Sequence, residues 1–144
     1  MRTYVIDTSV VVKWYNENDE KYVIQARQIL QDLRYNKISI IVSDLLSIEL
    51  TNVFLKGKSL VPSEIITLLQ NFFSLPLIVK ETSKSQLSRA AVIAYKNKIT
   101  VYDALYIALA ESLSCQLISD DQKAHGKLED DTVLMLKKYH SSKE

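Results

Sequence analysis

Short runs of β-branched and aromatic residues alternate with longer amphipathic segments along the whole chain, and this alternation is the strongest constraint on its fold. Five runs have the composition of β-strands, at residues 3–6, 38–42, 77–79, 116–119 and 132–136. The clearest segments with the apolar spacing of helices are 22–33, 44–56, 62–73, 83–96 and 101–113. Strands that alternate with helices predict a parallel sheet between helices, so we expect an α/β fold with a five-stranded sheet.

Composition narrows the class of protein further. A chain of 144 residues matches one domain, and its only glycines are Gly57 and Gly126. Two glycines cannot form the glycine-rich turn of a P-loop or of a dinucleotide-binding site, which excludes both. The single cysteine, Cys115, excludes an intrachain disulfide and a cysteine-rich zinc site. The net charge of +1 gives, by itself, no reason to expect a nucleic acid or a membrane as partner.

The N-terminal residues do not have the pattern of a signal peptide, because Asp7 interrupts the first apolar run. No apolar run approaches the ~20 residues of a membrane span. We therefore expect a soluble, cytoplasmic protein that does not associate with a membrane.

Acidic residues stand where two of the expected strands end. Asp7 follows the first strand, and Asp120 and Asp121 follow the fourth. Ligands of open parallel sheets bind outside the carboxyl ends of the strands, so Asp7 and Asp121 converge if these two strands are neighbours. Taken singly, each of these residues is also well suited to cap a helix or to stabilise a turn.

Two further acids lie in expected helices. The segment 101–113 is apolar on nearly all sides, so we expect it to be buried and Asp103 to enter a partly buried place. Thr100 and Asp103 have the spacing of a capping box, which explains this acid locally without excluding a ligand role. Glu49 flanks the apolar side of the segment 44–56, where a solvated surface position is the alternative.

These four acidic positions together predict a metal site. Carboxylates brought together repel one another and raise each other's pKa unless a cation neutralises them. Oxygen ligands without a thiolate or an imidazole favour Mg²⁺, with Mn²⁺ as a substitute, over Zn²⁺. The chemistry that uses such a site is phosphoryl transfer, in which metal ions activate water and stabilise the leaving oxygen.

Four segments of the chain occur in an order known from one protein family. They are Val5-Ile6-Asp7-Thr8-Ser9-Val10, Ser47-Ile48-Glu49-Leu50, Thr100-Val101-Tyr102-Asp103-Ala104-Leu105-Tyr106-Ile107-Ala108-Leu109-Ala110 and Leu117-Ile118-Ser119-Asp120-Asp121. With these segments the chain resembles the PIN-domain ribonucleases, and among them the VapC toxins of prokaryotic toxin–antitoxin (VapBC) pairs. The resemblance covers essentially the whole chain.

The resemblance implies a three-layer α/β/α sandwich with a five-stranded parallel sheet. We expect a single PIN-like domain at residues 1–136, followed by a polar, basic tail at 137–144. The resemblance also implies Mg²⁺-dependent endonucleolytic cleavage of RNA, a homodimer, and inhibition by a small antitoxin protein whose tail enters the active site.

Carried over by position, the resemblance places the acids of the metal site at Asp7, Glu49, Asp103 and Asp121. Two hydroxyl residues would support them: Ser9 lies two residues after Asp7, and Ser119 stands where the family usually has threonine. Because Asp120 and Asp121 are adjacent, either can be the fourth acid, and the spacing from Ser119 favours Asp121.

The expected mechanism is metal-assisted hydrolysis, in which Asp7 and Asp103 anchor one ion and Glu49 and Asp121 complete the cluster, directly or through water. The ion would lower the pKa of the attacking water. No histidine is required as a base, and His125 and His140 are interpreted as surface residues. A set of basic residues is a candidate RNA groove or an ordinary solvated surface: Lys13, Lys84, Arg89, Lys96 and Lys98.

Two unrelated classes are disfavoured because a required aspartate is missing from each, whereas two PIN-like alternatives stay open. A haloacid-dehalogenase-like phosphatase needs a second aspartate where this chain has Ser9, and a receiver-like switch needs one after the third strand, where Lys80 and Glu81 stand. A solitary PIN-like RNA-processing nuclease, or a PIN domain that binds RNA or a protein without cleavage, agrees with the same residues. The segments 44–56 and 62–73 are a candidate helical hairpin for holding the antitoxin.

Overall fold

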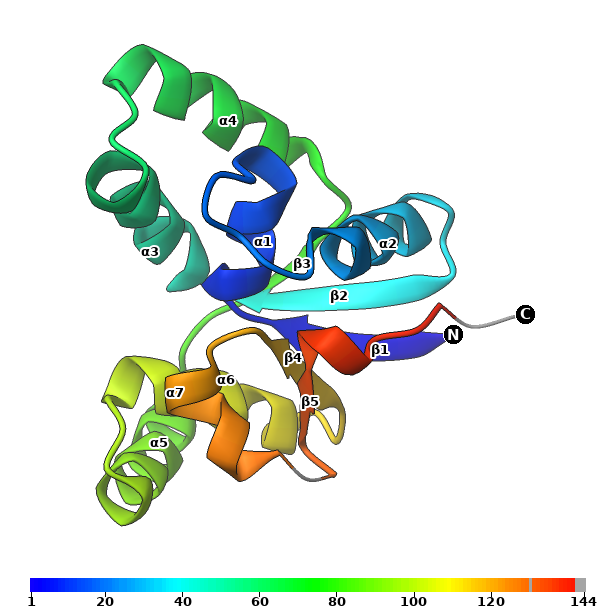
Figure 1. Cartoon of the computed structure of the whole chain (residues 1–144). Coiled ribbons are helices and arrows are strands. Elements are labelled where there is room, and N and C mark those ends of the chain that lie inside the picture. The colour runs from blue at the N-terminus through cyan, green and yellow to red at the C-terminus, as the bar shows by residue number, and fades with distance from the viewer. Residues whose placement is uncertain (130, 142–144) are drawn as a thin grey trace.

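The computed structural model describes residues 1–129 and 131–141 and contains one parallel β-sheet (Figure 1). Its strands are β1 (Arg2–Ile6), β2 (Ile38–Ser43), β3 (Ile78–Lys80), β4 (Gln116–Ser119) and β5 (Val133–Met135). They lie in the order β3-β2-β1-β4-β5, and every neighbouring pair is parallel. The predicted α/β class and all five predicted strands are confirmed.

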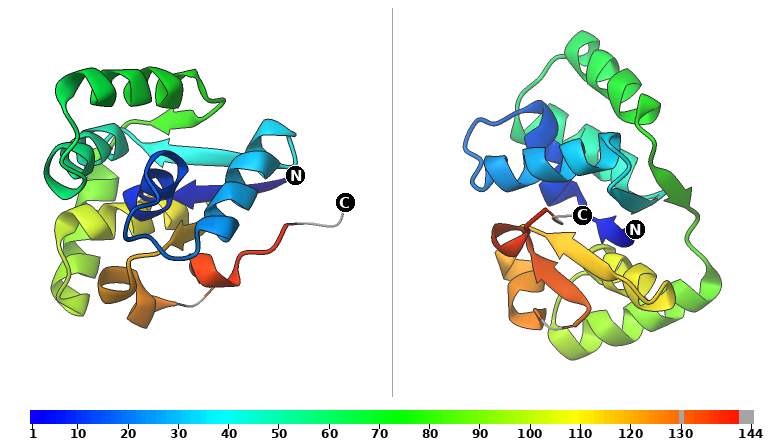
Figure 2. Two further views of the ribbon diagram at one scale, coloured as in Figure 1. Left: turned by 45° about the horizontal axis from the view of Figure 1, so that its top comes forward. Right: turned by 90° about the vertical axis from the view of Figure 1, so that its right-hand side faces the viewer.

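Helices cover both faces of this sheet and complete the three layers (Figures 1 and 2). One face carries α1 (Thr8–Tyr15), α2 (Val23–Arg34), α3 (Leu46–Asn52) and α4 (Pro62–Ser74). The other face carries α5 (Lys84–Asn97), α6 (Val101–Ser112) and α7 (Gln122–His125). Because helices lie on both sides, consecutive residues of β1 and β4 are buried whichever face they point to, and Val5, Ile6, Leu117 and Ile118 are fully buried.

The α6 helix is the buried helix that the sequence predicted. Every residue from Ala104 to Ala110 is buried, because α6 packs between α5 on one side and the strands β1 and β4 on the other. No helix in the described part of the chain has the length and apolar character needed to cross a membrane.

The expected helix at 44–56 has two parts. The α3 helix ends at Asn52 and continues as a π-helical turn, η1 (Val53–Gly57), that buries Phe54. A π turn has hydrogen bonds between residues five apart in place of four. The apolar spacing of three and four residues in the sequence does not predict this change. Pro62 occupies the first turn of α4 as expected, and α4 buries Phe72 while Phe73 is exposed.

The end of the chain packs further than the polar composition after residue 136 suggested. After η2 (Gly126–Leu128) and β5, a 3₁₀ turn, η3 (Leu136–Lys138), leads to the buried Tyr139. Tyr139 Oη donates a hydrogen bond to Asp32 Oδ2 on α2 (2.6 Å), and Ser141 Oγ donates to Asp32 Oδ1 (2.9 Å). The expected tail at 137–144 is thus attached to α2 as far as Ser141, and residues 142–144 lie outside the described residues.

The carboxyl ends of the strands meet at one edge of the sheet. The β1 and β4 strands are neighbours, with Ile6 in register with Ile118, so the residues that follow them emerge side by side. Asp7 follows β1, and Asp120 and Asp121 follow β4. This edge, where parallel sheets bind their ligands, is the place at which a functional site is expected.

Candidate active site

Asp7 is held at the junction of β1 and α1. Its Oδ1 accepts hydrogen bonds from the backbone N–H of Ser9 (3.2 Å) and from Ser9 Oγ (2.5 Å), so Asp7 caps α1. Its Oδ2 accepts a hydrogen bond from Ser119 Oγ (2.8 Å), which comes from the end of β4. Asp7 is 4% exposed, and these contacts fix the orientation of its carboxylate. The predicted capping role is confirmed, and the same carboxylate also lines the cavity described below.

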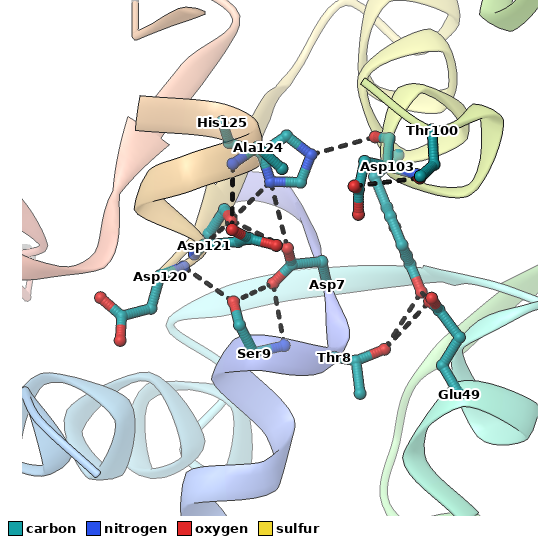
Figure 3. A network of polar contacts seen from close by, with 12 residues as sticks. Asp7, Thr8, Ser9, Glu49, Thr100, Asp103, Asp120, Asp121, Ala124 and His125 are labelled. Atoms are coloured by element: carbon teal, nitrogen blue, oxygen red, sulfur yellow. Dashed lines mark hydrogen bonds and ion pairs between the residues drawn. The ribbon is translucent and has the colours of Figure 1, made fainter. Parts of the chain in front are cut away.

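Glu49 and Asp103 approach from helices on opposite faces of the sheet (Figure 3). Glu49 Oε1, on α3, accepts hydrogen bonds from Thr8 Oγ1 (3.2 Å) and from the hydroxyl of Tyr106. Asp103, in the first turn of α6, accepts a hydrogen bond from Thr100 Oγ1 at Oδ2 (3.0 Å), and its own N–H donates to Thr100 Oγ1 (3.2 Å). The expected pairing of Thr100 and Asp103 is confirmed. The alternative of Glu49 as a solvated flank is wrong, because its carboxylate is bonded to residues of α1 and α6.

The four predicted acids line one cavity of about 330 Å³, together with a fifth acid, Glu20, from the loop between α1 and α2. The remaining lining residues are Thr8, Ser9, Val12, Val53 and Tyr106. No lysine or arginine within 1–129 and 131–141 is among the lining residues. The lining of the cavity is therefore electronegative, although Glu20 is itself paired with two lysines outside the lining, Lys13 and Lys58.

This electronegativity acts on the two acids that come from helices. Burial raises the pKa of Glu49 above its usual value, and the charges of Asp7 and Asp103 raise it further, while the hydrogen bonds from Tyr106 and Thr8 oppose the change. Burial also raises the pKa of Asp103, as do the charges of Asp121 and Asp7. A cation bound in the cavity would relieve this repulsion.

The donor set fits a hard divalent cation. Carboxylate oxygens are the ligands that Mg²⁺ and Mn²⁺ prefer, and four of them, from four separate parts of the chain, share the cavity. As the side chains are placed, no three acidic, histidine or cysteine side chains among the described residues come together closely enough to form a metal-binding group. The carboxylates thus share a cavity without converging on one point.

Asp120 and Asp121 have different environments although they are adjacent. The carboxylate of Asp120 is 2.8 Å from Lys13 Nζ, and its backbone N–H donates a hydrogen bond to Ser9 Oγ (2.8 Å). Asp121 lines the acidic cavity and caps α7, because its Oδ1 accepts a hydrogen bond from the N–H of Ala124 (3.0 Å). The backbone N–H of Asp121 donates to Ser119 Oγ (3.0 Å), so Ser119 contacts both Asp7 and the turn that carries Asp121.

Lys13 is buried, so its interpretation as an RNA-groove or solvated residue is wrong. Its side chain is 2% exposed, and its Nζ lies 2.9 Å from Glu20 and 2.8 Å from Asp120. Burial by itself lowers the pKa of Lys13, but the two carboxylates outweigh burial and raise it above the usual value. The carboxylate of Glu20 also forms an ion pair with Lys58, whose Nζ lies 2.7 Å away. Nothing in the polar loop that carries Glu20 distinguishes this residue from its neighbours in the sequence.

His125 is also buried, and its interpretation as a surface residue is wrong. Its Nδ1 is 2.7 Å from Ser119 Oγ and 3.3 Å from Asp7 Oδ2, and its Nε2 is 3.0 Å from the backbone oxygen of Asp103 (Figure 3). Burial lowers the pKa of His125, but the hydrogen bond and charge of Asp7 outweigh it and raise the pKa to about 9. One signal was available: His125 lies four residues after Asp121, on the same side of a helical turn.

Comparison with known families and structures gives a consistent result. The sequence profile of the PIN domain matches residues 4–127. No curated protein sequence matches the chain at a significant level.

Several solved structures share the fold. A chain of the DNA-bound VapBC from Salmonella typhimurium superimposes with a TM-score of 0.68 at 14% identity, over 94% of this chain and 99% of that chain. VapC20 from Mycobacterium tuberculosis, a toxin that cleaves the sarcin-ricin loop, superimposes with a TM-score of 0.66 at 11% identity, over 86% of this chain and 94% of that chain.

PAE2754 from Pyrobaculum aerophilum superimposes with a TM-score of 0.66 at 19% identity, over 94% of this chain and 90% of that chain. At such identities these likenesses establish the fold. The profile match covers most of the chain, and the strand order and the acids at the carboxyl edge agree with it. The chain therefore belongs to the PIN-domain family.

Proposed function

We propose that the protein is a Mg²⁺-dependent endoribonuclease and the toxin of a type II toxin–antitoxin pair. The observation that carries the proposal is the acidic cavity at the carboxyl edge of a PIN-domain sheet, lined by Asp7, Glu49, Asp103 and Asp121. In this proposal these four carboxylates hold the divalent cation. Mg²⁺, or Mn²⁺ in its place, would supply Lewis-acid activation of water and neutralise charge on the phosphodiester.

The side chains around the acids have orienting roles in this proposal. Ser9 and Ser119 hold the two oxygens of Asp7, and Thr8 and Tyr106 hold Glu49. Both ring nitrogens of His125 already face protein partners, so we assign His125 no role as the base that activates water. A cation held by the four carboxylates would lower the pKa of the attacking water, and the proton would pass to solvent water.

The test is an RNA cleavage assay on the purified protein, with Mg²⁺, with Mn²⁺ and with EDTA. We expect cleavage with either ion and none with EDTA. Asp7→Asn and Asp103→Asn should each lower the rate by at least about 100-fold, because each removes a charged ligand. The matched control is Glu81→Gln, which removes a charge from an exposed position outside the cavity and should leave the rate unchanged. RNA binding without cleavage by the wild type would instead support a non-cleaving PIN domain.

The partners in this proposal are an RNA substrate and a cognate small antitoxin, and a second copy of the chain in a homodimer. The antitoxin is supported by the fold shared with toxin–antitoxin complexes from Klebsiella pneumoniae and Rickettsia felis. A cellular RNA as substrate requires action in the cytoplasm. Light scattering of the purified chain, and co-purification with the product of an adjacent small open reading frame, test the dimer and the antitoxin. A solitary nuclease would show cleavage without such a partner.

A further inference from the structure

A second cavity adjoins the acidic one, and its lining adds three lysines to two of the same carboxylates. Its volume is about 590 Å³, and Asp103 and Asp121 form a wall that both cavities share. The other lining residues are Lys98, Ile99, Thr100, Lys123, Ala124 and Lys127. We call this hollow the basic cavity, after its three lysines. It continues directly from the place where the proposed cation and the scissile phosphate would lie.

The three lysines reach the basic cavity from three separate turns of the chain. Lys98 follows the last residue of α5, Lys123 lies in α7, and Lys127 lies in η2. All three are exposed to solvent. Lys127 Nζ donates a hydrogen bond to the backbone oxygen of Asn97 (2.7 Å), which places the ammonium group without neutralising it. The fold thus brings the ammonium groups of three lysines to one cavity.

No acidic side chain among the described residues forms an ion pair with these lysines, although Asp103 and Asp121 line the same cavity. Other basic residues do form ion pairs: Lys13 and Lys58 pair with Glu20, and Arg89 pairs with Glu111. Three ammonium groups without an ion pair among the described residues therefore line the cavity that adjoins the acidic one.

We propose that the basic cavity binds backbone phosphates of the RNA strand on one side of the scissile bond. This inference rests on the proposed function, and it names where the substrate lies. The argument is charge complementarity together with continuity: a polyanion cannot rest on the acidic cavity except at the cation, so its neighbouring phosphates need a separate cationic surface. Lysine ammonium groups are point charges that contact phosphate without reading bases, so this subsite contributes affinity and not sequence choice.

The test compares two triple variants, each of which removes three positive charges. The test variant is Lys98→Gln, Lys123→Gln and Lys127→Gln. The matched control is Lys37→Gln, Lys80→Gln and Lys137→Gln, whose lysines are exposed and line neither cavity. Binding of a fluorescent single-stranded RNA is measured by anisotropy over a range of salt concentrations, in EDTA so that the RNA stays intact. Circular dichroism establishes that both variants are folded.

We expect the test variant to bind RNA at least about 10-fold more weakly than the wild type near 0.1 M salt. Each lost phosphate contact lowers the slope of log Kd against log salt concentration by about 0.7, so the loss of three contacts should lower this slope by about 2. The control should keep most of the wild-type affinity and slope. Equal slopes for the two variants would overturn the proposal. Loss of antitoxin binding alone, with RNA binding intact, would also overturn it and assign the cavity to the protein partner.

A cleavage assay with Mg²⁺ separates this inference from the proposed function. For an oligonucleotide substrate, the test variant should raise KM by about 10-fold with kcat within about twofold, because the metal-site acids are intact. For a dinucleotide, which has no flanking phosphates, its activity should equal that of the wild type. Absence of cleavage by the wild type contradicts the proposed function, whereas a wild-type KM in the test variant contradicts only the subsite.

Discussion

Asp120 and Asp121 show how two adjacent identical residues acquire different roles. The backbone turn after β4 sends Asp120 toward Lys13 and Asp121 toward the acidic cavity. Asp120 is one of two carboxylates, with Glu20, that pair with the buried ammonium group of Lys13. The distinction is invisible in the sequence, where only the spacing from Ser119 favoured Asp121.

The first prediction concerns these two residues. Asp121→Asn should weaken Mn²⁺ binding by at least about 10-fold, because the cavity loses a charged ligand, while the asparagine oxygen can still cap α7. Asp120→Asn should leave Mn²⁺ affinity within about twofold but lower the free energy of unfolding by about 1–2 kcal/mol, because Lys13 keeps only Glu20 as its charged partner. Isothermal titration and urea unfolding measure the two effects. The reverse pattern would make Asp120 the metal ligand.

The second prediction concerns His125 in the metal-free protein. Its pKa is raised to about 9 in the folded state, against about 6.5 for an unperturbed histidine. The folded protein therefore binds more protons than the unfolded chain between these values, so the stabilisation is complete below pH ~6.5 and is lost as the pH rises through about 9. Over this range the free energy of unfolding should fall by up to about 3 kcal/mol.

Urea unfolding in EDTA between pH 6 and 9.5 measures this dependence. His125→Gln should remove most of the decline. His140→Gln, at an exposed position, is the matched control and should follow the wild type. A decline of the same size in His125→Gln would show that another group is responsible.

The acids of the site could be predicted because the fold itself places them. Asp7 and Asp121 end neighbouring strands, and a parallel sheet brings such positions together whatever its other residues are. The burial of His125 and Lys13 could not be predicted in this way. Both depend on contacts between distant segments, Lys13 with Glu20 and Asp120, and His125 with Asp7 and the carbonyl of Asp103.

At the level of elements, apolar spacing in the sequence predicted the strands and the main helices. It did not predict the π turn that follows α3 or the 3₁₀ turn that follows β5. The α6 helix was recognised because it is apolar on all sides and is buried as a whole. The π turn η1 and the 3₁₀ turn η3 keep the spacing of their surroundings, so periodicity gives no sign of them. The docking of the chain end on α2 uses one buried acid, Asp32, and the two residues of the chain end that bond to it, Tyr139 and Ser141, lie more than a hundred residues away in the sequence.

The third prediction tests that docking. Tyr139→Phe removes one donor to Asp32, a carboxylate that is 1% exposed, and should lower the free energy of unfolding by about 1–3 kcal/mol. Gln28 and Ser141 still donate to Asp32, which keeps the loss within this range. The matched control is Tyr95→Phe, at a side chain that is 91% exposed, and should change stability by less than about 0.5 kcal/mol. Equal effects of the two changes would show that the contact does not stabilise the fold.

For the molecule as a whole, the distribution of charge says more than its sum. The chain carries a net charge of +1, which gave no reason to expect a nucleic acid as partner. The structure separates the charges: five carboxylates line one cavity, and three lysines without ion pairs in the described part of the chain line its neighbour. Folding of an almost neutral sequence thus places a cavity lined by acids beside one that three lysines and two of those acids line.

The acidic cavity leads to a prediction for the stability of the whole molecule. A cation that binds only the folded state stabilises it by about 2.7 kcal/mol when its concentration is 100 times its Kd. For a domain of this size, that corresponds to a rise in Tm of about 5–10 °C. We expect Mg²⁺ and Mn²⁺ each to raise the Tm of the wild type by this amount at saturating concentration, and EDTA to reverse the rise.

Differential scanning calorimetry of matched variants shows whether the rise comes from this cavity. Asp7→Asn and Asp103→Asn should shift in Tm by less than about 2 °C with either ion, because each removes a carboxylate from the cavity. Glu81→Gln, which also removes one negative charge, should keep the full rise, and so should the triple variant of the basic cavity. An equal rise in all variants would mean that the ions act on the surface in general. In that case only the RNA-binding experiment would distinguish the contribution of the acidic cavity from that of the basic cavity.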